Sequence, residues 1–266
     1  MFDSLSINAQ WVRLAADIAI RDIQARYKRS LVGIAWIVLN PIAMLAIYWI
    51  VFAVVLKVTW RDPVTNQTVG FVLPFFAGLV FYLFFADVVV SSANLFVSKR
   101  NYVMKSAFPI WVLWLANLIR AGVTGLINVI ILLLIALSEH GLSLAGLFWI
   151  VITLLTGALF TSALSLLLSC LGPFIGDIGD AAELVLRVLF YTAPLTYPLE
   201  FVPESFRSLM WLNPLTHVIE PLRRAVVFSR APEPGLLVMF TVSAALLLIL
   251  STWVFQRTRG VIADVV

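Results

Sequence analysis

Three acidic residues lie close together and could act as a general acid and a general base. They are Asp177, Asp180 and Glu183. Carboxylates at this spacing could support a glycosyl or acyl transfer onto a lipid-linked substrate in a membrane enzyme. The alternative is a solvated turn that caps the start of a helix, where negative charge is favourable. The spacing allows both interpretations, and the solvated capping turn is favoured.

The sequence contains no motif that would bind nucleotide phosphates or a metal ion. It has no Gly-Lys dipeptide and therefore no P-loop. His140 and His217 lack the HExxH spacing of zinc enzymes, and Cys170 is the only cysteine, which excludes sites built from paired cysteines. We therefore expect no catalytic residue, metal site or cofactor in this chain, so any ATP must be hydrolysed by a partner.

Two ionisable residues fall inside long apolar stretches. Arg120 lies roughly ten residues into one of them, about 15 Å along a helix, and Asp87 lies in the stretch before it. A charge at this depth is costly unless it faces protein or water. Arg120 could line a conduit for an anionic substrate, or it could extend to the membrane surface or pair with an acid such as Asp87. Both interpretations remain open.

Aromatic residues crowd the first two apolar stretches. Their rings could stack on the C–H surfaces of sugars, whereas packing or lipid contact explains any single ring. As a set they favour a path for a glycan. The candidate conduit residues, taken with Arg120, are Trp36, Tyr48, Trp49, Phe81, Tyr82 and Phe85.

The composition indicates a membrane protein. Hydrophobic residues make up 62% of the chain and charged residues 12%, which is more apolar surface than a compact soluble core could bury. We expect an all-α membrane protein with a single transmembrane domain over residues 1–266. Its six transmembrane helices are predicted at 33–56, 70–92, 110–137, 144–170, 183–197 and 235–255.

Basic residues cluster beside the apolar stretches, as expected for groups that set membrane orientation. The net charge is +4, but no broad basic face is formed, so nucleic acid is not an expected partner. Lys and Arg are enriched in the segments that would face the cytoplasm if both termini did, which predicts a cytoplasmic N-terminus and C-terminus.

Three further segments depart from plain spans and loops. Residues 1–30 are predicted to form an amphipathic interface helix on the cytoplasmic membrane surface, with Trp11, Leu14, Ala15 and Ile18 on its apolar face. Residues 94–109 combine apolar and basic residues and are expected to form a short inner helix. Residues 198–234 are apolar and rich in proline, which favours short re-entrant helices in the outer leaflet.

Several motifs resemble those of a known family. The stretch RDIQARYKRSLVGIAW at 21–36 resembles the lead-in to the first span of type-2 ABC exporter permeases that move polysaccharides. KSAFP at 105–109 is similar to the family's inner coupling region, and APLTYP at 193–198 with LNPL at 212–215 is similar to its outer gate. GDI at 176–178 matches the turn before the fifth span, except that Gly176 stands where an arginine is usual. The motifs occur in the family's order along nearly the whole chain.

The resemblance implies an ATP-driven exporter of the bacterial inner membrane, in a family whose members export O-antigen, capsule or teichoic acid. It implies a homodimer with two copies of a cytoplasmic ABC ATPase, which would bind ATP and Mg, and a lipid-linked polysaccharide as substrate, with membrane lipid around the chain. The implied ATPase-coupling residues are Asn94, Phe96, Lys99, Arg100, Asn101 and Tyr102, with Arg26 and Lys28 beside them. The implied outer gate residues are Pro203, Trp211, Asn213 and Pro214.

The motifs leave two other functions open. An ABC exporter of a small drug or lipid would share the same features, and only the width of the conduit would separate it from a polysaccharide exporter. A membrane transferase acting on lipid-linked substrates is the third interpretation, and it rests on Asp177, Asp180 and Glu183.

Overall fold

The structure is a computed structural model that describes residues 9–28, 30–61, 68–104, 108–139 and 141–266. It is 81% helical. Within the described residues the strands form one two-stranded antiparallel hairpin, β1 (Trp60–Arg61) with β2 (Thr68–Val69). The prediction of an all-α membrane protein is therefore confirmed.

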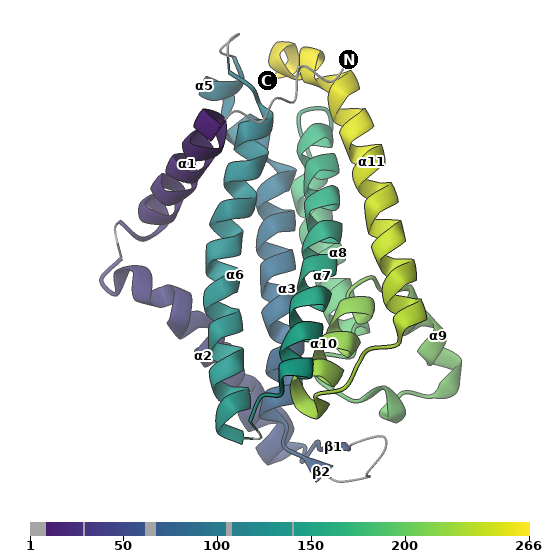
Figure 1. The fold of residues 1–266 in the computed structure, drawn as a ribbon. Helices are drawn as coiled ribbons and strands as arrows, with labels where there is room; N and C mark the ends of the chain where they lie inside the picture. The colour runs from purple at the N-terminus through teal and green to yellow at the C-terminus, as the bar shows by residue number, and fades with distance from the viewer. Residues whose placement is uncertain (1–8, 29, 62–67, 105–107, 140) are drawn as a thin grey trace.

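The centre of the molecule is α3 (Val72–Ala93), an apolar helix surrounded by other helices (Figure 1). It packs against α6 (Trp111–Glu139), α7 (Leu144–Leu171) and α8 (Ile178–Thr192), and α11 (Pro234–Val265) lies along α7. The side chains of Phe75, Phe76, Phe81 and Phe85 are almost fully buried. Burial of four phenylalanines on one helix makes α3 the core of the bundle.

Within the described part of the chain, five helices are long and apolar enough to cross a membrane: 33–55, α3, α6, α7 and α11. The predicted fifth span at 183–197 differs from the structure, because α8 begins at Ile178 and ends at Thr192. The helix ends there because Ala193 takes an extended conformation before Pro194, which disfavours helical geometry in its predecessor. At 15 residues α8 is about 22 Å long, so the sixth crossing remains a prediction.

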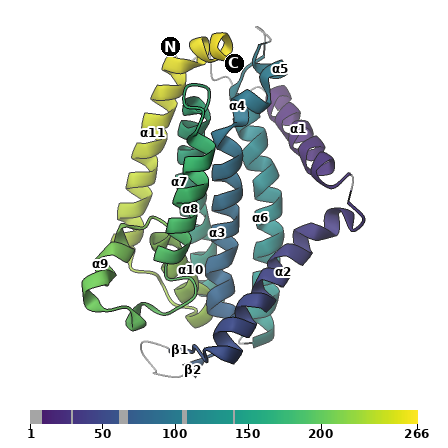
Figure 2. The same cartoon turned by 180° about the vertical axis from the view of Figure 1, so that it is seen from behind.

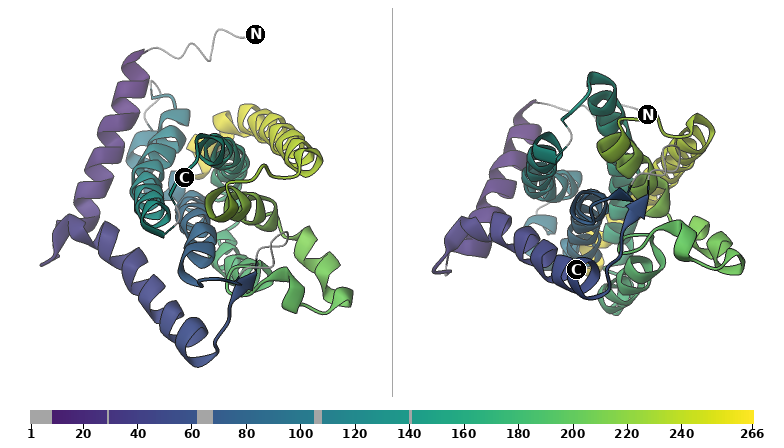
Figure 3. Two further views of the ribbon diagram at one scale, coloured as in Figure 1. Left: turned by 60° about the horizontal axis from the view of Figure 1, so that its bottom comes forward. Right: turned by 90° about the horizontal axis from the view of Figure 1, so that it is seen from below.

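The first apolar helix stands away from the bundle. It consists of a short 3-10 turn, η2 (Gly33–Ala35), followed by α2 (Trp36–Tyr48) and a π-helical segment, η3 (Trp49–Val55). Most of its side chains are exposed, including Trp36 and Trp49. Figure 3 shows α1 and α2 as an arm on one side of the bundle, while α9 projects from the other side.

Helix α1 (Ala9–Tyr27) differs from the expected surface helix. Its apolar face lies against protein, with Ala15 and Ile18 buried in one cluster with Leu113 and Ala116 of α6. Small residues on both helices allow this close approach. The prediction that Ala15 and Ile18 face lipid was therefore wrong. Residues 1–8 and 29 of the predicted interface helix lie outside the described residues.

The two ends of the bundle carry different elements. One, called the α5 end here, holds α4 (Leu95–Ser98), α5 (Arg100–Val103) and the C-terminus (Figures 1 and 2). The other, the hairpin end, holds β1, β2, η4 (Leu199–Phe201), α9 (Glu204–Leu212) and α10 (Thr216–Phe228). Short helices were expected at 198–234, but α10 packs against α3 and α7 within the core, so protein rather than lipid covers much of it.

Candidate transport and coupling site

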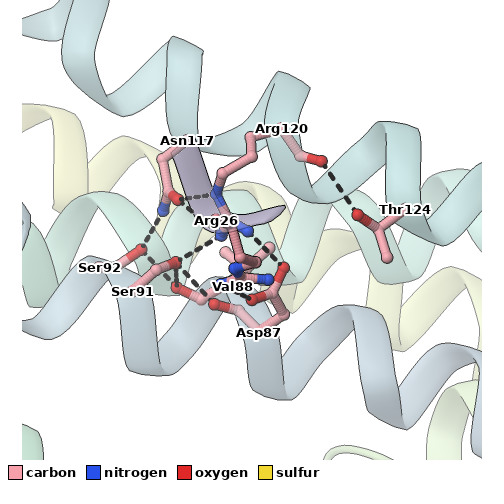
Figure 4. Close-up of polar contacts among 8 residues, drawn as sticks. All are labelled: Arg26, Asp87, Val88, Ser91, Ser92, Asn117, Arg120 and Thr124. Atoms are coloured by element: carbon pink, nitrogen blue, oxygen red, sulfur yellow. Dashed lines mark hydrogen bonds and ion pairs between the residues drawn. The ribbon is translucent and has the colours of Figure 1, made fainter. Parts of the chain in front are cut away.

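Asp87 lies between two arginines from different helices (Figure 4). Its Oδ2 is 2.8 Å from Nη1 of Arg120 on α6, and its Oδ1 is 3.2 Å from Nη2 of Arg26 on α1. The Arg120 side chain is 8% exposed, and that of Arg26 is 49% exposed. Asp87 therefore joins three helices through charge, and one positive charge remains in excess at this cluster.

Other donors of Arg120 are hydrogen-bonded to neighbouring side chains. Nη2 donates to Asn117 Oδ1 at 3.0 Å and to Ser91 Oγ at 3.1 Å. Asn117 in turn donates to Ser92 Oγ at 3.1 Å, which lies 2.6 Å from Ser165 Oγ on α7. Buried polar groups are tolerated when they are all hydrogen-bonded, so this network stabilises the contact of α3, α6 and α7.

Of the two interpretations of Arg120, the structure shows the pairing with Asp87. Its role in a conduit stays a prediction. For Arg26, partial burial lowers the pKa, but the Asp87 carboxylate and Tyr27 together raise it by more, so the net pKa lies above its ordinary value.

The predicted coupling segment is held in place by one buried ring and one ion pair. Phe96 of α4 is fully buried, in the same cluster as Ile18 of α1 and Ile262 of α11. Lys99 Nζ lies 2.6 Å from Asp22 Oδ1 of α1. The expected single helix is divided at Lys99 into two four-residue helices. Residues 105–107 of the KSAFP motif lie outside the described residues.

The other residues implied in coupling are divided between packing and exposure. Tyr102 is partly buried, and its ring centroid lies 5.4 Å from that of Phe108. The α5 end displays the exposed residues Asn94, Arg100 and Asn101, whereas the exposed Lys28 follows the end of α1 that points away from the α5 end (Figure 1). A partner at this end would contact amide and basic side chains on a segment that Phe96 and the Lys99–Asp22 pair anchor to the bundle.

The predicted conduit aromatics occupy three different environments. Trp36 and Trp49 are exposed on the first helix, whereas Phe81 and Phe85 lie in the core. Tyr48 and Tyr82 gather around a ring that was not predicted, that of Phe190 on α8. The ring centroids of Tyr48 and Tyr82 lie 5.9 Å and 4.8 Å from that of Phe190.

The predicted outer gate residues divide in a similar way. Pro203 and Trp211 are exposed, and Pro214 is partly buried. Asn213 is 4% exposed and donates to Leu189 O at 2.8 Å, which links the start of α10 to the end of α8. Their role in gating stays a prediction.

Arg223 was not predicted and lies buried beneath this region. Its guanidinium donates to Pro74 O at 3.2 Å and to Pro194 O at 2.6 Å, and it pairs with Glu220. Its Cζ lies 3.9 Å from the ring centroid of Trp60. One arginine thus ties α10 to α3, to the segment after α8 and to the hairpin. No short-range pattern predicts this, since Pro74 and Trp60 are far from Arg223 in sequence.

The three acidic residues do not converge on one point. Asp177 precedes α8 without a side-chain capping bond, Asp180 lies in the first turn, and Glu183 pairs with Arg187 at 3.7 Å. Arg187 was also not predicted, although its position four residues after Glu183 is a signal for such a pair. Among the described residues no group of three His, Cys, Asp or Glu side chains could hold a metal ion. His140 lies outside them.

Comparison with known proteins identifies the family. A sequence profile described as ABC-2 type transporter matches residues 17–227. An O-antigen export system permease protein of Klebsiella pneumoniae is 28% identical over 204 residues, which are 76% of this chain and 75% of that protein. A protein of the same description from Myxococcus xanthus is 24% identical over 259 residues, 96% of each chain. A polysialic acid transport protein of Escherichia coli is 21% identical over 228 residues, 84% of this chain and 85% of that protein. The chain belongs to the ABC-2 type transporter family.

Proposed function

We propose that this chain is the transmembrane permease subunit of an ATP-driven exporter that moves a lipid-linked polysaccharide across the bacterial inner membrane. The observation that carries the proposal is the construction of the α5 end. A short segment anchored by Phe96 and by the Lys99–Asp22 pair presents Asn94, Arg100 and Asn101 to a partner. The polysaccharide follows from the relatives, whose names describe O-antigen export and polysialic acid transport.

The partner in this proposal is a cytoplasmic ABC ATPase. The chain itself has no P-loop, so ATP and Mg would be bound and hydrolysed by that subunit. A homodimer of permeases with two ATPase copies gives each coupling segment one ATPase. The α5 end faces the cytoplasm in this arrangement, which agrees with the exposed Arg100, Arg257 and Arg259 at that end.

The connection of the coupling segment to the spans supports force transfer. The Lys99–Asp22 pair joins α5 to α1, and the Arg26–Asp87 pair joins α1 to α3. A displacement imposed on α5 by the ATPase would thus reach two elements by packed and charged contacts. The substrate itself would be contacted by the aromatic residues of the first two spans.

Purification of the tagged chain from its native membrane tests the proposal. We expect a P-loop ATPase to co-purify, and deletion of the chain's gene to remove a polysaccharide from the cell surface. The matched control is an Arg100→Glu, Asn101→Asp double variant, which should insert normally while retaining less ATPase. Purification without an ATPase, together with an unchanged cell surface, would contradict the proposal.

A further inference from the structure

Helix α8 has three distinct faces although it lies beside a membrane span. Ile178, Ala182, Leu186 and Phe190 are buried against the bundle. A second face exposes apolar side chains, Leu184, Val185 and Val188. The third face, called the polar stripe here, consists of Asp180, Glu183, Arg187 and Tyr191. At about 100° per residue, these four residues fall within an arc of about 80°.

The packing places this stripe at membrane depth. Leu186 and Leu189 line the same cavity as Phe85 and Val89 of α3, and the Phe190 ring contacts that of Tyr82. Arg187 therefore lies alongside the middle of α3, which is 22 residues long and apolar. Along α8, Arg187 lies nine residues after Ile178 and five before Thr192, which is more than one turn from either end of the helix.

Lipid is an unfavourable surrounding for the polar stripe. The side chains of Arg187 and Glu183 are 73% and 54% exposed, so this bundle leaves both charges uncovered. A charged group at the bilayer centre costs about 2.5–3.5 kcal/mol on insertion scales and more in other estimates. The neighbouring apolar face supplies a surface for lipid. The polar stripe is then expected to face water.

At about 100° per residue, Ala86 and Val90 lie between Val89, which lines the cavity beside α8, and Asp87, so the stripe and the Asp87 cluster lie at the two edges of one face of α3. Figure 2 shows α3 between α8 on one side and α6 with α2 on the other. The charges on the two edges balance. Among the described residues they are three arginines and three acids: Arg26, Arg120, Arg187, Asp87, Asp180 and Glu183.

We propose that the polar stripe of α8 is a water-exposed wall of the translocation path, and that the path carries a polysaccharide whose repeating unit has no net charge. This inference rests on the proposed function. Arg187 would donate to sugar hydroxyls, Glu183 would accept from them, and Tyr191 would offer a stacking surface. A path for a polyanion would instead need an excess of positive charge along its walls.

Thiol labelling of the permease–ATPase complex in membranes tests whether the polar stripe is accessible to water. Cys170 is the only cysteine, so Cys170→Ala provides a background for Arg187→Cys and Tyr191→Cys. Val188→Cys on the apolar face is the matched control. Methanethiosulfonates carrying a sulfonate should label the two stripe positions at least about tenfold faster than position 188, because the thiolate that reacts is disfavoured in lipid. Equal rates at all three positions would overturn the proposal, including the case in which a second copy covers the stripe.

The charge of the path is tested at Tyr191→Cys, which leaves every charge in place. The anionic sulfonate and a cationic trimethylammonium reagent, each normalised to a free thiol, should react within about threefold of one another, and Glu183→Gln should shift the ratio toward the anion. A preference for the sulfonate above about tenfold would overturn the neutral path.

The exported polymer gives an independent measurement. After removal of its lipid end, polysaccharide whose surface display requires this chain should pass an anion exchanger unretained, and retention would overturn the inference. Absence of any such polysaccharide would contradict the proposed function instead. The labelling of the stripe remains interpretable in that case.

Discussion

Arg26 and Arg120 bind the two oxygens of the same carboxylate, that of Asp87, although they lie 94 residues apart in the sequence, on α1 and α6. Arg120 approaches Oδ2 at 2.8 Å and Arg26 approaches Oδ1 at 3.2 Å. Because α1 also carries Asp22, which pairs with Lys99, the N-terminal helix connects the α5 end to the interior of the bundle. A rearrangement that lifts α1 must break both pairs.

Removal of the Asp87 charge should destabilise the permease strongly. In Asp87→Asn the buried Arg120 loses its counter-charge, and breaking a buried pair in this way costs about 3–5 kcal/mol. Arg26→Ala should cost no more than about 1 kcal/mol, because that side chain is half exposed and solvent weakens the pair. Thermal unfolding of the purified protein measures both. Equal losses in the two variants would show that Arg120 does not depend on Asp87.

Substitutions in the coupling segment should fall into two classes. Those at buried residues should lower stability, and those at exposed residues should weaken contact with the ATPase. Phe96→Ala removes a fully buried ring and should cost about 3–5 kcal/mol of stability. Arg100→Ala and Asn101→Ala alter exposed side chains, so stability should change by less than about 0.5 kcal/mol, while stimulation of the partner ATPase falls. The measurements are thermal unfolding and ATP hydrolysis by the reconstituted complex. Normal stimulation with both exposed variants would exclude this surface from coupling.

The sequence predicted a helix and its ends well where a long apolar run lies between polar residues. The predicted ranges 110–137 and 144–170 agree closely with α6 and α7, since a continuous apolar run between polar residues has few alternatives. The prediction for α8 was poorer, because its apolar residues share the helix with Asp180, Glu183 and Arg187. Periodicity there describes a helix with one polar face rather than a uniformly apolar span.

Contacts between distant residues were the part that sequence could not supply. Pairing of Arg120 with Asp87 was one of several options, because an arginine at this depth has several possible partners. The packing of α1 on α6 was missed for a similar reason. From sequence alone, an apolar helical face could contact either lipid or protein. The packing of this face on Leu113 and Ala116 is visible only in the structure.

Gly172 should tolerate no side chain. A Cβ built there would lie 2.1 Å from the carbonyl oxygen of Ala93, at the crossing between the end of α7 and the end of α3. Gly172→Ala must therefore displace backbone, with an expected loss of about 1–3 kcal/mol or more. Gly176→Ala is the control, since open space surrounds its Cβ position. Thermal unfolding that is the same for both variants would contradict the close contact.

Arg223 should be replaceable neither by lysine nor by glutamine. Its planar fork reaches Pro74 O and Pro194 O while lying over Trp60, and a lysine ammonium cannot make these contacts together. Each buried acceptor left without a partner costs about 1–3 kcal/mol, so Arg223→Lys should lower the unfolding temperature by several degrees. Arg223→Gln should be worse, because it also leaves the partly buried Glu220 without its cation.

The neighbouring Arg224 supplies the matched control for this prediction. It pairs with Glu233 at 3.1 Å, but both side chains are substantially exposed, so Arg224→Lys should change stability by less than about 1 kcal/mol. Thermal unfolding of the three purified variants measures the difference. Equal behaviour of Arg223→Lys and Arg224→Lys would mean that the carbonyl contacts of Arg223 add nothing to the stability of the hairpin end.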